Sequence, residues 1–197
     1  MQCPTRRQLV ALTLTMPLGL AKLAAAQFIH PDLESLMTRM AAVTERRALF
    51  REERRIAALS QPLISTGSLH YRRPGWLEKR TESPVVERFL VDGDKVVLDT
   101  AEEGRRSFDL GQAPELRALV DSVRAPLAGD LDALRRGFQV SFTGTLAEWQ
   151  LDLEPLDDQV GRLLRRASLA GSGDQLQEML SVQANGDAFA MRIRQLT

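Results

Sequence analysis

The stretch at residues 65–81, STGSLHYRRPGWLEKRT, carries the pattern on which the predicted fold depends. Apolar and polar residues alternate through LHYR at 69–72, which is the period of a half-buried strand. Residues 73–75, Arg-Pro-Gly, interrupt this strand because proline lacks an amide donor and glycine accepts turn dihedral angles. A second extended run follows at 76–81, so the stretch predicts a β-hairpin.

An arginine ends the apolar row on one face of the first strand. Counting in steps of two places Leu69, Tyr71 and Arg73 on the same face. Spacing alone leaves two interpretations of Arg73 open: its side chain extends into solvent at the strand end, or it points inward and has a function.

Most of the remaining chain has the alternation of short strands separated by turn residues. Strand patterns occur at 85–91, 95–99, 105–110, 138–143, 146–153, 176–184 and 187–196, with Asp92-Gly93-Asp94 and Asn185-Gly186 as the clearest turns. The segment 50–59 fits either a charged helix or a strand, and its periodicity does not decide between them. Gly171-Ser172-Gly173-Asp174 indicates a loop.

Two longer helices are predicted from apolar residues at helical spacing. One begins after Asp32 and runs to about Arg46, and the other runs from Pro114 to Arg124, with Pro126 ending it. The first stripe is Leu33, Leu36, Met37, Met40 and Val43, the second is Leu116, Leu119, Val120 and Val123, and shorter helical segments are expected at 130–136 and 157–165. The prediction is an α+β, mainly β fold, in which helices pack against one face of an antiparallel sheet.

Residues 1–26 have the organisation of a signal peptide for export. Arg6-Arg7 form a basic region, residues 9–20 an apolar region, and Ala24-Ala25-Ala26 supply the small residues of a cleavage site. The basic pair also resembles a twin-arginine signal, so export by the general or by the twin-arginine route stays open. The mature chain, 27–197, has the length of a single domain, which we expect to be soluble in the periplasm.

The composition argues against several classes of function. Lysine plus arginine and aspartate plus glutamate each number 26, and no long basic run indicates a nucleic-acid partner. The single cysteine, Cys3, precedes the apolar run, so neither a lipid anchor nor a disulfide is expected. His30 and His70 lie far apart in the sequence, and no phosphate-binding loop or nucleophile elbow occurs. We therefore predict no metal site, no cofactor and no enzymatic activity.

Short motifs around the hairpin resemble those of one known family. They are Pro62-Leu63, Ser65-x-Gly67-x-Leu69-x-Tyr71-x-Arg73-Pro74, Leu77-Glu78-Lys79 and Val91-Asp92-Gly93-Asp94. In their order and spacing they are similar to the LolA family of periplasmic carriers of outer-membrane lipoproteins, and more narrowly to the LolA-related group. The resemblance covers most of the chain after about residue 30, and it favours a strand for 50–59.

The resemblance implies an incomplete, strongly curved antiparallel half-barrel, which a helical lid closes over a hollow for acyl chains. It places Arg73 at the arginine that latches the lid, where a buried guanidinium needs acceptors such as helix-end carbonyls. The hollow would be lined by Leu69, Tyr71, Trp76, Leu77, Phe89 and Val91, and the lid helices would present Leu33, Leu36, Met37, Met40, Leu116, Leu119, Val120 and Val123. Whether Leu77 or Trp76 points inward stays open.

The resemblance also implies a monomeric carrier that receives its cargo from an inner-membrane transporter and delivers it to an outer-membrane acceptor. The chain departs from the family pattern after the Asp-Gly turn, where Val96-Val97-Leu98-Asp99 replace the usual aromatic residues, and at Leu77, where a bulky aromatic is usual. These departures make another lipid or a glycolipid at least as suitable a cargo as a lipoprotein. The alternative is a non-enzymatic periplasmic module of the same fold that senses lipids or regulates a partner.

Overall fold

A single antiparallel sheet dominates the computed structural model, which describes residues 31–196. The strands are β1 (Glu45–Arg55), β2 (Leu63–Arg72), β3 (Trp76–Ser83), β4 (Glu87–Asp92), β5 (Lys95–Thr100), β6 (Gly104–Asp109), β7 (Phe138–Thr145), β8 (Glu148–Pro155), β9 (Leu164–Ser172), β10 (Gln175–Gln183) and β11 (Ala188–Gln195). The helices are α1 (Pro31–Ala42), α2 (Pro114–Ala128), α3 (Leu131–Gly137) and α4 (Asp158–Gly161), with a 3-10 turn at Leu110–Gln112. No helix in this part of the chain is both long and apolar enough to cross a membrane. The predicted export signal, 1–26, lies outside the described residues.

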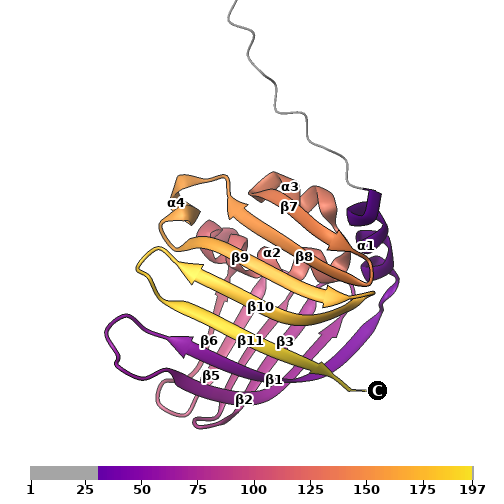
Figure 1. Cartoon of the computed structure of the whole chain (residues 1–197). Helices are drawn as coiled ribbons and strands as arrows, with labels where there is room; N and C mark the ends of the chain where they lie inside the picture. The colour runs from indigo at the N-terminus through magenta and orange to yellow at the C-terminus, as the bar shows by residue number, and fades with distance from the viewer. Residues whose placement is uncertain (1–30, 197) are drawn as a thin grey trace, which may run out of the picture.

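Consecutive strands pair as hairpins, and the first and last strands meet in the middle of the sheet. The strand order is β6-β5-β4-β3-β2-β1-β11-β10-β9-β8-β7, and Phe50 of β1 lies opposite Ile193 of β11. Because β6 and β7 form its two ends, the sheet is an open half-barrel. Figure 1 shows the sheet curving back on itself, with β3, β5 and β6 behind β9–β11 and α2 between these two halves. The predicted mainly β, antiparallel half-barrel is confirmed.

β2 and β3 form the predicted hairpin, with Tyr71 opposite Leu77. Gly67 lies at a register shift between the two strands, where a Cβ atom would be 1.9 Å from the carbonyl oxygen of Arg80. Only glycine fits at such a close approach of two backbones. The irregularity bends the strand locally, which contributes to the curvature of the sheet.

The ambiguous segment 50–59 is a strand over its first half, as part of β1. β1 pairs with β2 on one side and with β11 on the other, so its backbone groups are satisfied by two ladders. The predicted first helix is too long by several residues, since α1 ends at Ala42. Glu45 and Arg46 cannot extend it because they already pair with Arg72 and Tyr71 in the sheet.

α2 continues through Pro126, which corrects the helix end predicted at Arg124. A proline in the last turn removes one backbone hydrogen bond, but the continued helix buries Ala125 and Leu127, which offsets that loss. Gly129 then ends the helix in the left-handed region, at φ 69°, and its N–H donates to the Pro126 carbonyl at 3.0 Å.

The region around β9 differs from the structure predicted from the sequence. The sequence predicts a helical segment at 157–165 and a loop at 171–174, whereas α4 is one short turn and β9 extends from Leu164 to Ser172. Small residues such as Ala167 and Gly171 have a weak intrinsic preference for strands. β9 forms because β8 and β10 pair with it on both sides, which no local pattern reveals.

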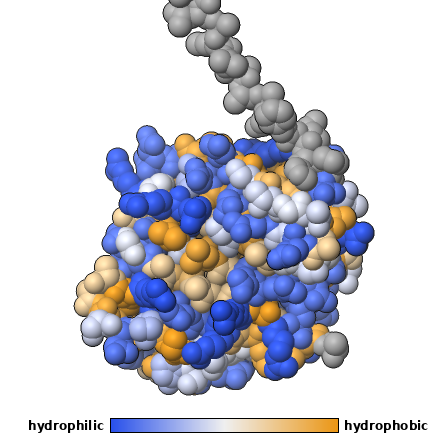
Figure 2. All heavy atoms as spheres, in the orientation of Figure 1, coloured by the Kyte–Doolittle hydropathy of each residue, from blue (hydrophilic) through white to orange (hydrophobic). Residues whose placement is uncertain are grey.

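The main core lies between the concave face of the sheet and the helices. Leu36 and Met40 of α1 pack there with Leu134 of α3 and with Leu151 and Leu153 of β8. Charged pairs such as Arg47 with Glu45, and Arg88 with Glu78, occupy the convex face. In Figure 2, hydrophilic residues cover much of the outer face of β8–β11, with apolar residues scattered among them. The alternation along each strand thus separates a solvated outside from an apolar inside.

Candidate functional site

A cavity of about 200 Å³ lies between α2 and the concave face of the sheet. Strands from both halves of the sheet contribute to its wall, which includes the apolar residues Leu69, Leu77, Phe89, Val123, Met179 and Met191. Its volume is below the roughly 300–1,000 Å³ that is usual for small-molecule sites. In this conformation the cavity is therefore smaller than a long acyl chain needs.

Four of the six residues predicted to line a hollow lie in the wall of this cavity. Leu69 and Tyr71 come from β2, Leu77 from β3 and Phe89 from β4. Their strands place them on one face because Tyr71 is opposite Leu77, and Lys79 is opposite both Leu69 and Phe89. The register also shows that Leu77, and not Trp76, points toward the concave face.

Trp76 does not line the cavity, which corrects its predicted position. It lies opposite Arg72, whose guanidinium stacks over the indole at 4.4 Å from the ring centroid. The ring of His70 meets the same indole edge-on, with the centroids 4.8 Å apart. These three side chains form a cluster on the convex face, one residue out of phase with Tyr71 and Leu77.

Val91 lies next to the cavity rather than in its wall. It is fully buried in a second, smaller cluster with Val96, Leu110 and Val120 of α2. This cluster fastens the first part of α2 to β4 and β5 by apolar contact, so Val91 supports the helix that covers the cavity.

The two predicted lid helices have different roles in the structure. α2 covers the cavity, and Val123 and Leu127 form part of the wall, while Leu119 packs on the main core and Leu116 is 38% exposed. The α1 residues Leu33, Leu36, Met37 and Met40 are buried in the main core instead. Leu127 escaped the sequence analysis because the predicted helix ended before it.

Arg73 is exposed in this conformation. Its backbone N–H donates to the Thr44 carbonyl at 2.9 Å, but within residues 31–196 its guanidinium has no hydrogen bond or ion pair. The expected contact with helix-end carbonyls is therefore not found among the described residues. A latch at Arg73 stays a prediction.

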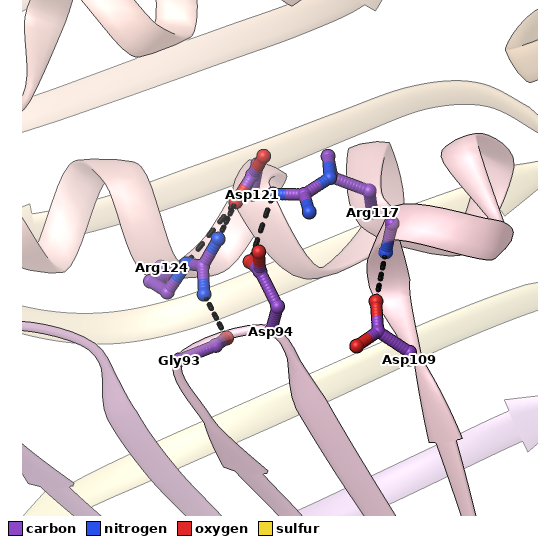
Figure 3. A network of polar contacts seen from close by, with 7 residues as sticks. Gly93, Asp94, Asp109, Arg117, Asp121 and Arg124 are labelled. Carbon is purple, nitrogen blue, oxygen red and sulfur yellow. Dashed lines mark hydrogen bonds and ion pairs between the residues drawn. The ribbon is translucent and has the colours of Figure 1, made fainter.

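Two other arginines join α2 to the turn between β4 and β5. Arg117 pairs with Asp94 at 3.0 Å, and Arg124 donates from Nη1 to the Gly93 carbonyl at 2.6 Å while it pairs with Asp121 at 2.6 Å (Figure 3). The hydrogen bond from Arg117 holds the pKa of Asp94 below its usual value. Arg117 and Arg124 are seven residues apart in the predicted helix at 114–124, and this spacing could have placed both arginines on one face of the helix.

The cavity wall also carries polar groups that a purely apolar hollow would not need. Glu52 of β1, 4% exposed, pairs with Lys79 at 2.5 Å and with Arg54 at 3.4 Å. Arg46 bonds to Asp174 in the β9–β10 turn, at 2.7 Å between the side chains. Burial raises the pKa of the Tyr71 phenol, an effect that the nearby Arg73 and Arg46 charges oppose. Sequence alternation could have placed Arg46 and Glu52 on the inner face, because Ala48 and Phe50 lie between them.

A larger and more open hollow of about 940 Å³ lies along β7–β11. Many of its lining residues are charged or carry amides, including Glu148, Gln150, Gln177, Glu178 and Arg192, so it does not suit an apolar chain. Between residues 31 and 196, no group of three or more histidine, cysteine, aspartate or glutamate side chains is arranged to hold a metal ion.

An open half-barrel with an apolar cavity beneath a helix has the LolA-like fold. A sequence model of the family described as outer membrane lipoprotein carrier protein LolA-like matches residues 24–193, and the chain belongs to this family. No curated protein matches the sequence.

The chain is also similar to several solved structures. One is a LolA superfamily protein from Nitrosomonas europaea, with 9% identity, a TM-score of 0.44, and coverage of 82% of this chain and 91% of that chain. Another is a putative outer membrane lipoprotein-sorting protein domain from Vibrio parahaemolyticus, with 8% identity, a TM-score of 0.45, and coverage of 84% and 91%. A DUF1329 family protein from Desulfovibrio piger has 8% identity and a TM-score of 0.45, with coverage of 82% and 88%.

Proposed function

We propose that this protein is a periplasmic carrier that encloses the acyl chains of a lipoprotein or another lipid and moves them from the inner to the outer membrane. The observation that carries the proposal is the apolar cavity beneath α2, lined from the sheet by Leu69, Leu77 and Phe89. Membership of the LolA-like family supports it, and so does the composition of residues 1–26, which is that of an export signal. A donor in the inner membrane, an acceptor in the outer membrane and a monomeric state belong to the same proposal.

Entry of the cargo requires α2 to separate from the sheet. The ion pair between Arg117 of α2 and Asp94 of the β4–β5 turn is weak enough to break. The side chains of Arg117 and Asp94 are 35% and 57% exposed, and such solvent-exposed pairs contribute little to stability. Each methylene that leaves water contributes about 0.8 kcal/mol. An acyl chain that displaces α2 must also replace the apolar contacts of Val120 with the cluster of Val91, Val96 and Leu110, so several of its methylenes have to be buried.

A carrier must also release its cargo, and the composition of the cavity wall suits exchange. Met179 and Met191 have flexible, unbranched side chains that adapt to partners of different shape. The pair of Glu52 with Lys79 keeps charge close to the apolar surface, which limits how much of a chain can be fully enclosed.

The proposal is tested by purifying the protein from the periplasm, identifying bound lipids by mass spectrometry and measuring transfer of labelled lipid between donor and acceptor vesicles. We expect bound acyl lipids and transfer that depends on protein concentration. Binding without transfer would favour the alternative, a lipid-sensing or regulatory module that uses the same cavity. A protein that binds no acyl probe would contradict both functions.

A further inference from the structure

One part of the cavity wall is polar, and its residues come from three neighbouring strands. Arg46 of β1 and Tyr71 of β2 are directly opposite each other and both line the cavity. Gln195 of β11 also lines it and lies opposite Ala48, the next residue of β1 on the concave face. Directly opposed residues such as Arg46 and Tyr71 have their Cβ atoms about 5 Å apart, and diagonal neighbours such as Arg46 and Gln195 are about 7–8 Å apart, so the guanidinium, the phenol and the amide share one patch.

Two of these groups have unused hydrogen-bonding capacity within residues 31–196. Tyr71 is 3% exposed and its buried hydroxyl has no partner there, and the buried Oε1 of Gln195 has none either. The Nε2 of Gln195 donates to the Leu176 carbonyl at 3.1 Å, which sets the orientation of the amide. Buried polar atoms are almost always satisfied in folded proteins, so these two indicate a place for a polar ligand group or an ordered water.

Arg46 supplies this patch with a positive charge whose present partner can be exchanged. Its side chain is 14% exposed, and its Nη1 donates to the Asp174 backbone carbonyl, whereas the Asp174 carboxylate that Nη2 contacts at 2.7 Å is 47% exposed. The Asp174 carboxylate can therefore turn into solvent at little cost, while the contact with the Asp174 backbone carbonyl keeps the guanidinium in place. The other buried charge of the wall, Glu52, is already compensated by Lys79 and Arg54. A ligand anion could then accept hydrogen bonds from both Arg46 and the Tyr71 hydroxyl.

We propose that the cavity selects amphiphiles in which the acyl chain carries an anionic group, a carboxylate or a phosphate, held by Arg46 and Tyr71. Gln195 accepts a hydrogen bond from a hydroxyl of the same head or from a bridging water. The inference rests on the proposed acyl-binding function and narrows its cargo. An acyl ester or amide is neutral and cannot replace the Asp174 carboxylate as the partner of the Arg46 guanidinium. A lipid with a neutral end should therefore bind less tightly at this patch.

The test compares two fluorescent probes with the same chain, cis-parinaric acid and its methyl ester, in titrations of the purified protein. The wild type should bind the acid about tenfold more tightly than the ester, which is the factor that one charged hydrogen-bonded contact supplies. Arg46→Gln should abolish this preference and Arg46→Lys should keep part of it. Tyr71→Phe should weaken acid binding about fivefold and ester binding by a smaller factor, because a neutral ester carbonyl accepts a weaker hydrogen bond than a carboxylate. Arg47→Gln is the matched control, because Arg47 is the next residue of β1 and its side chain is 66% exposed on the convex face.

The outcomes separate this inference from the function on which it rests. Equal affinity of the wild type for acid and ester, or a preference that survives in Arg46→Gln, would overturn the anionic-head assignment and leave the acyl cavity standing. Failure of both probes to bind would overturn the carrier function itself. In a competition experiment, 1-palmitoylglycerol 3-phosphate should displace the probe better than monopalmitoylglycerol. Displacement by inorganic phosphate alone would mean a site for free anions and would also overturn the assignment.

Discussion

Arg124 of α2 donates a hydrogen bond to the carbonyl oxygen of Gly93 at 2.6 Å and so joins the helix over the cavity to the turn between β4 and β5. In the latch that the family resemblance implies, an arginine of the sheet donates to carbonyls of the lid helices. Here the donor and acceptor sides are exchanged, because the guanidinium belongs to the helix and the carbonyl to the sheet. Gly75, in the β2–β3 turn, lies against the same side chain, since a Cβ there would be 3.2 Å from the Arg124 Cδ. Arg124 thus connects α2 with two hairpin turns at one end of the sheet.

Arg124→Met should loosen α2 while it keeps an apolar stem of similar length. The loss of a hydrogen bond to a charged donor should lower the free energy of unfolding by about 1–2 kcal/mol. Uptake and release of an acyl fluorophore, followed by stopped-flow fluorescence, should both become faster. Arg136→Met, at an exposed arginine of α3, is the control. Unchanged rates in Arg124→Met would show that this contact does not hold the helix closed.

Arg73→Leu tests the latch that the resemblance implies. Because the Arg73 side chain is exposed, the free energy of unfolding should change by less than about 0.5 kcal/mol. Release of lipid to acceptor vesicles should nevertheless become slower, since the proposed latch acts in the state that expels cargo. Release at the wild-type rate would count against Arg73 as a latch.

Leu69→Glu should abolish the binding of acyl chains, because it places a carboxylate in the apolar part of the cavity wall. Ser68→Glu adds the same group to the neighbouring residue, which faces the other side of β2, and should bind like the wild type. Titration with a fluorescent fatty acid measures binding, and circular dichroism verifies that both variants keep the sheet. Equal binding by the two variants would refute the position of the cavity.

Gly67→Ala should destabilise the protein by about 2 kcal/mol, since the added methyl group would overlap the Arg80 carbonyl and force the two strands apart. Gly137→Ala is the matched control, because nothing lies within 4 Å of a Cβ at that position. The control should be neutral or slightly stabilising. Chemical denaturation of both variants gives the comparison, and a Gly67→Ala protein as stable as the wild type would disprove the close approach.

The pair of Arg117 with Asp94 predicts a dependence of stability on pH. The pKa of Asp94 in the folded protein lies below its ordinary value of 3.8, mainly because Arg117 donates a hydrogen bond to the carboxylate. The contribution of the pair is therefore present above the ordinary value and is lost as the pH falls through the folded-state pKa. Asp94→Asn should be less stable than the wild type at pH 7, and the difference should shrink below about pH 4. A difference that stays constant down to pH 2 would contradict this assignment.

The cavity residues divide into those that a local pattern could place and those that it could not. Leu69 and Tyr71 follow from alternation within one strand, but the choice between Leu77 and Trp76 depends on the register with β2. Leu127 depends on how far α2 extends, and that extent is set by burial against the core rather than by helix propensity. The patch of Arg46, Tyr71 and Gln195 joins residues far apart in the chain, which only the pairing of β1 with β2 and β11 brings together.

The sequence by itself determined the elements whose cause is local: the β2–β3 hairpin around its Pro-Gly interruption, the Asn185-Gly186 turn, and the apolar stripes of α1 and α2. Each depends on the preferences of a few adjacent residues, which remain the same in any tertiary context. The tertiary structure alone decided β9, the end of α2, the exposure of Arg73 and the contact of Arg124 with Gly93. These features arise from neighbours distant in the sequence, whose ladder bonds and buried contacts outweigh local propensities that differ by only about 1 kcal/mol.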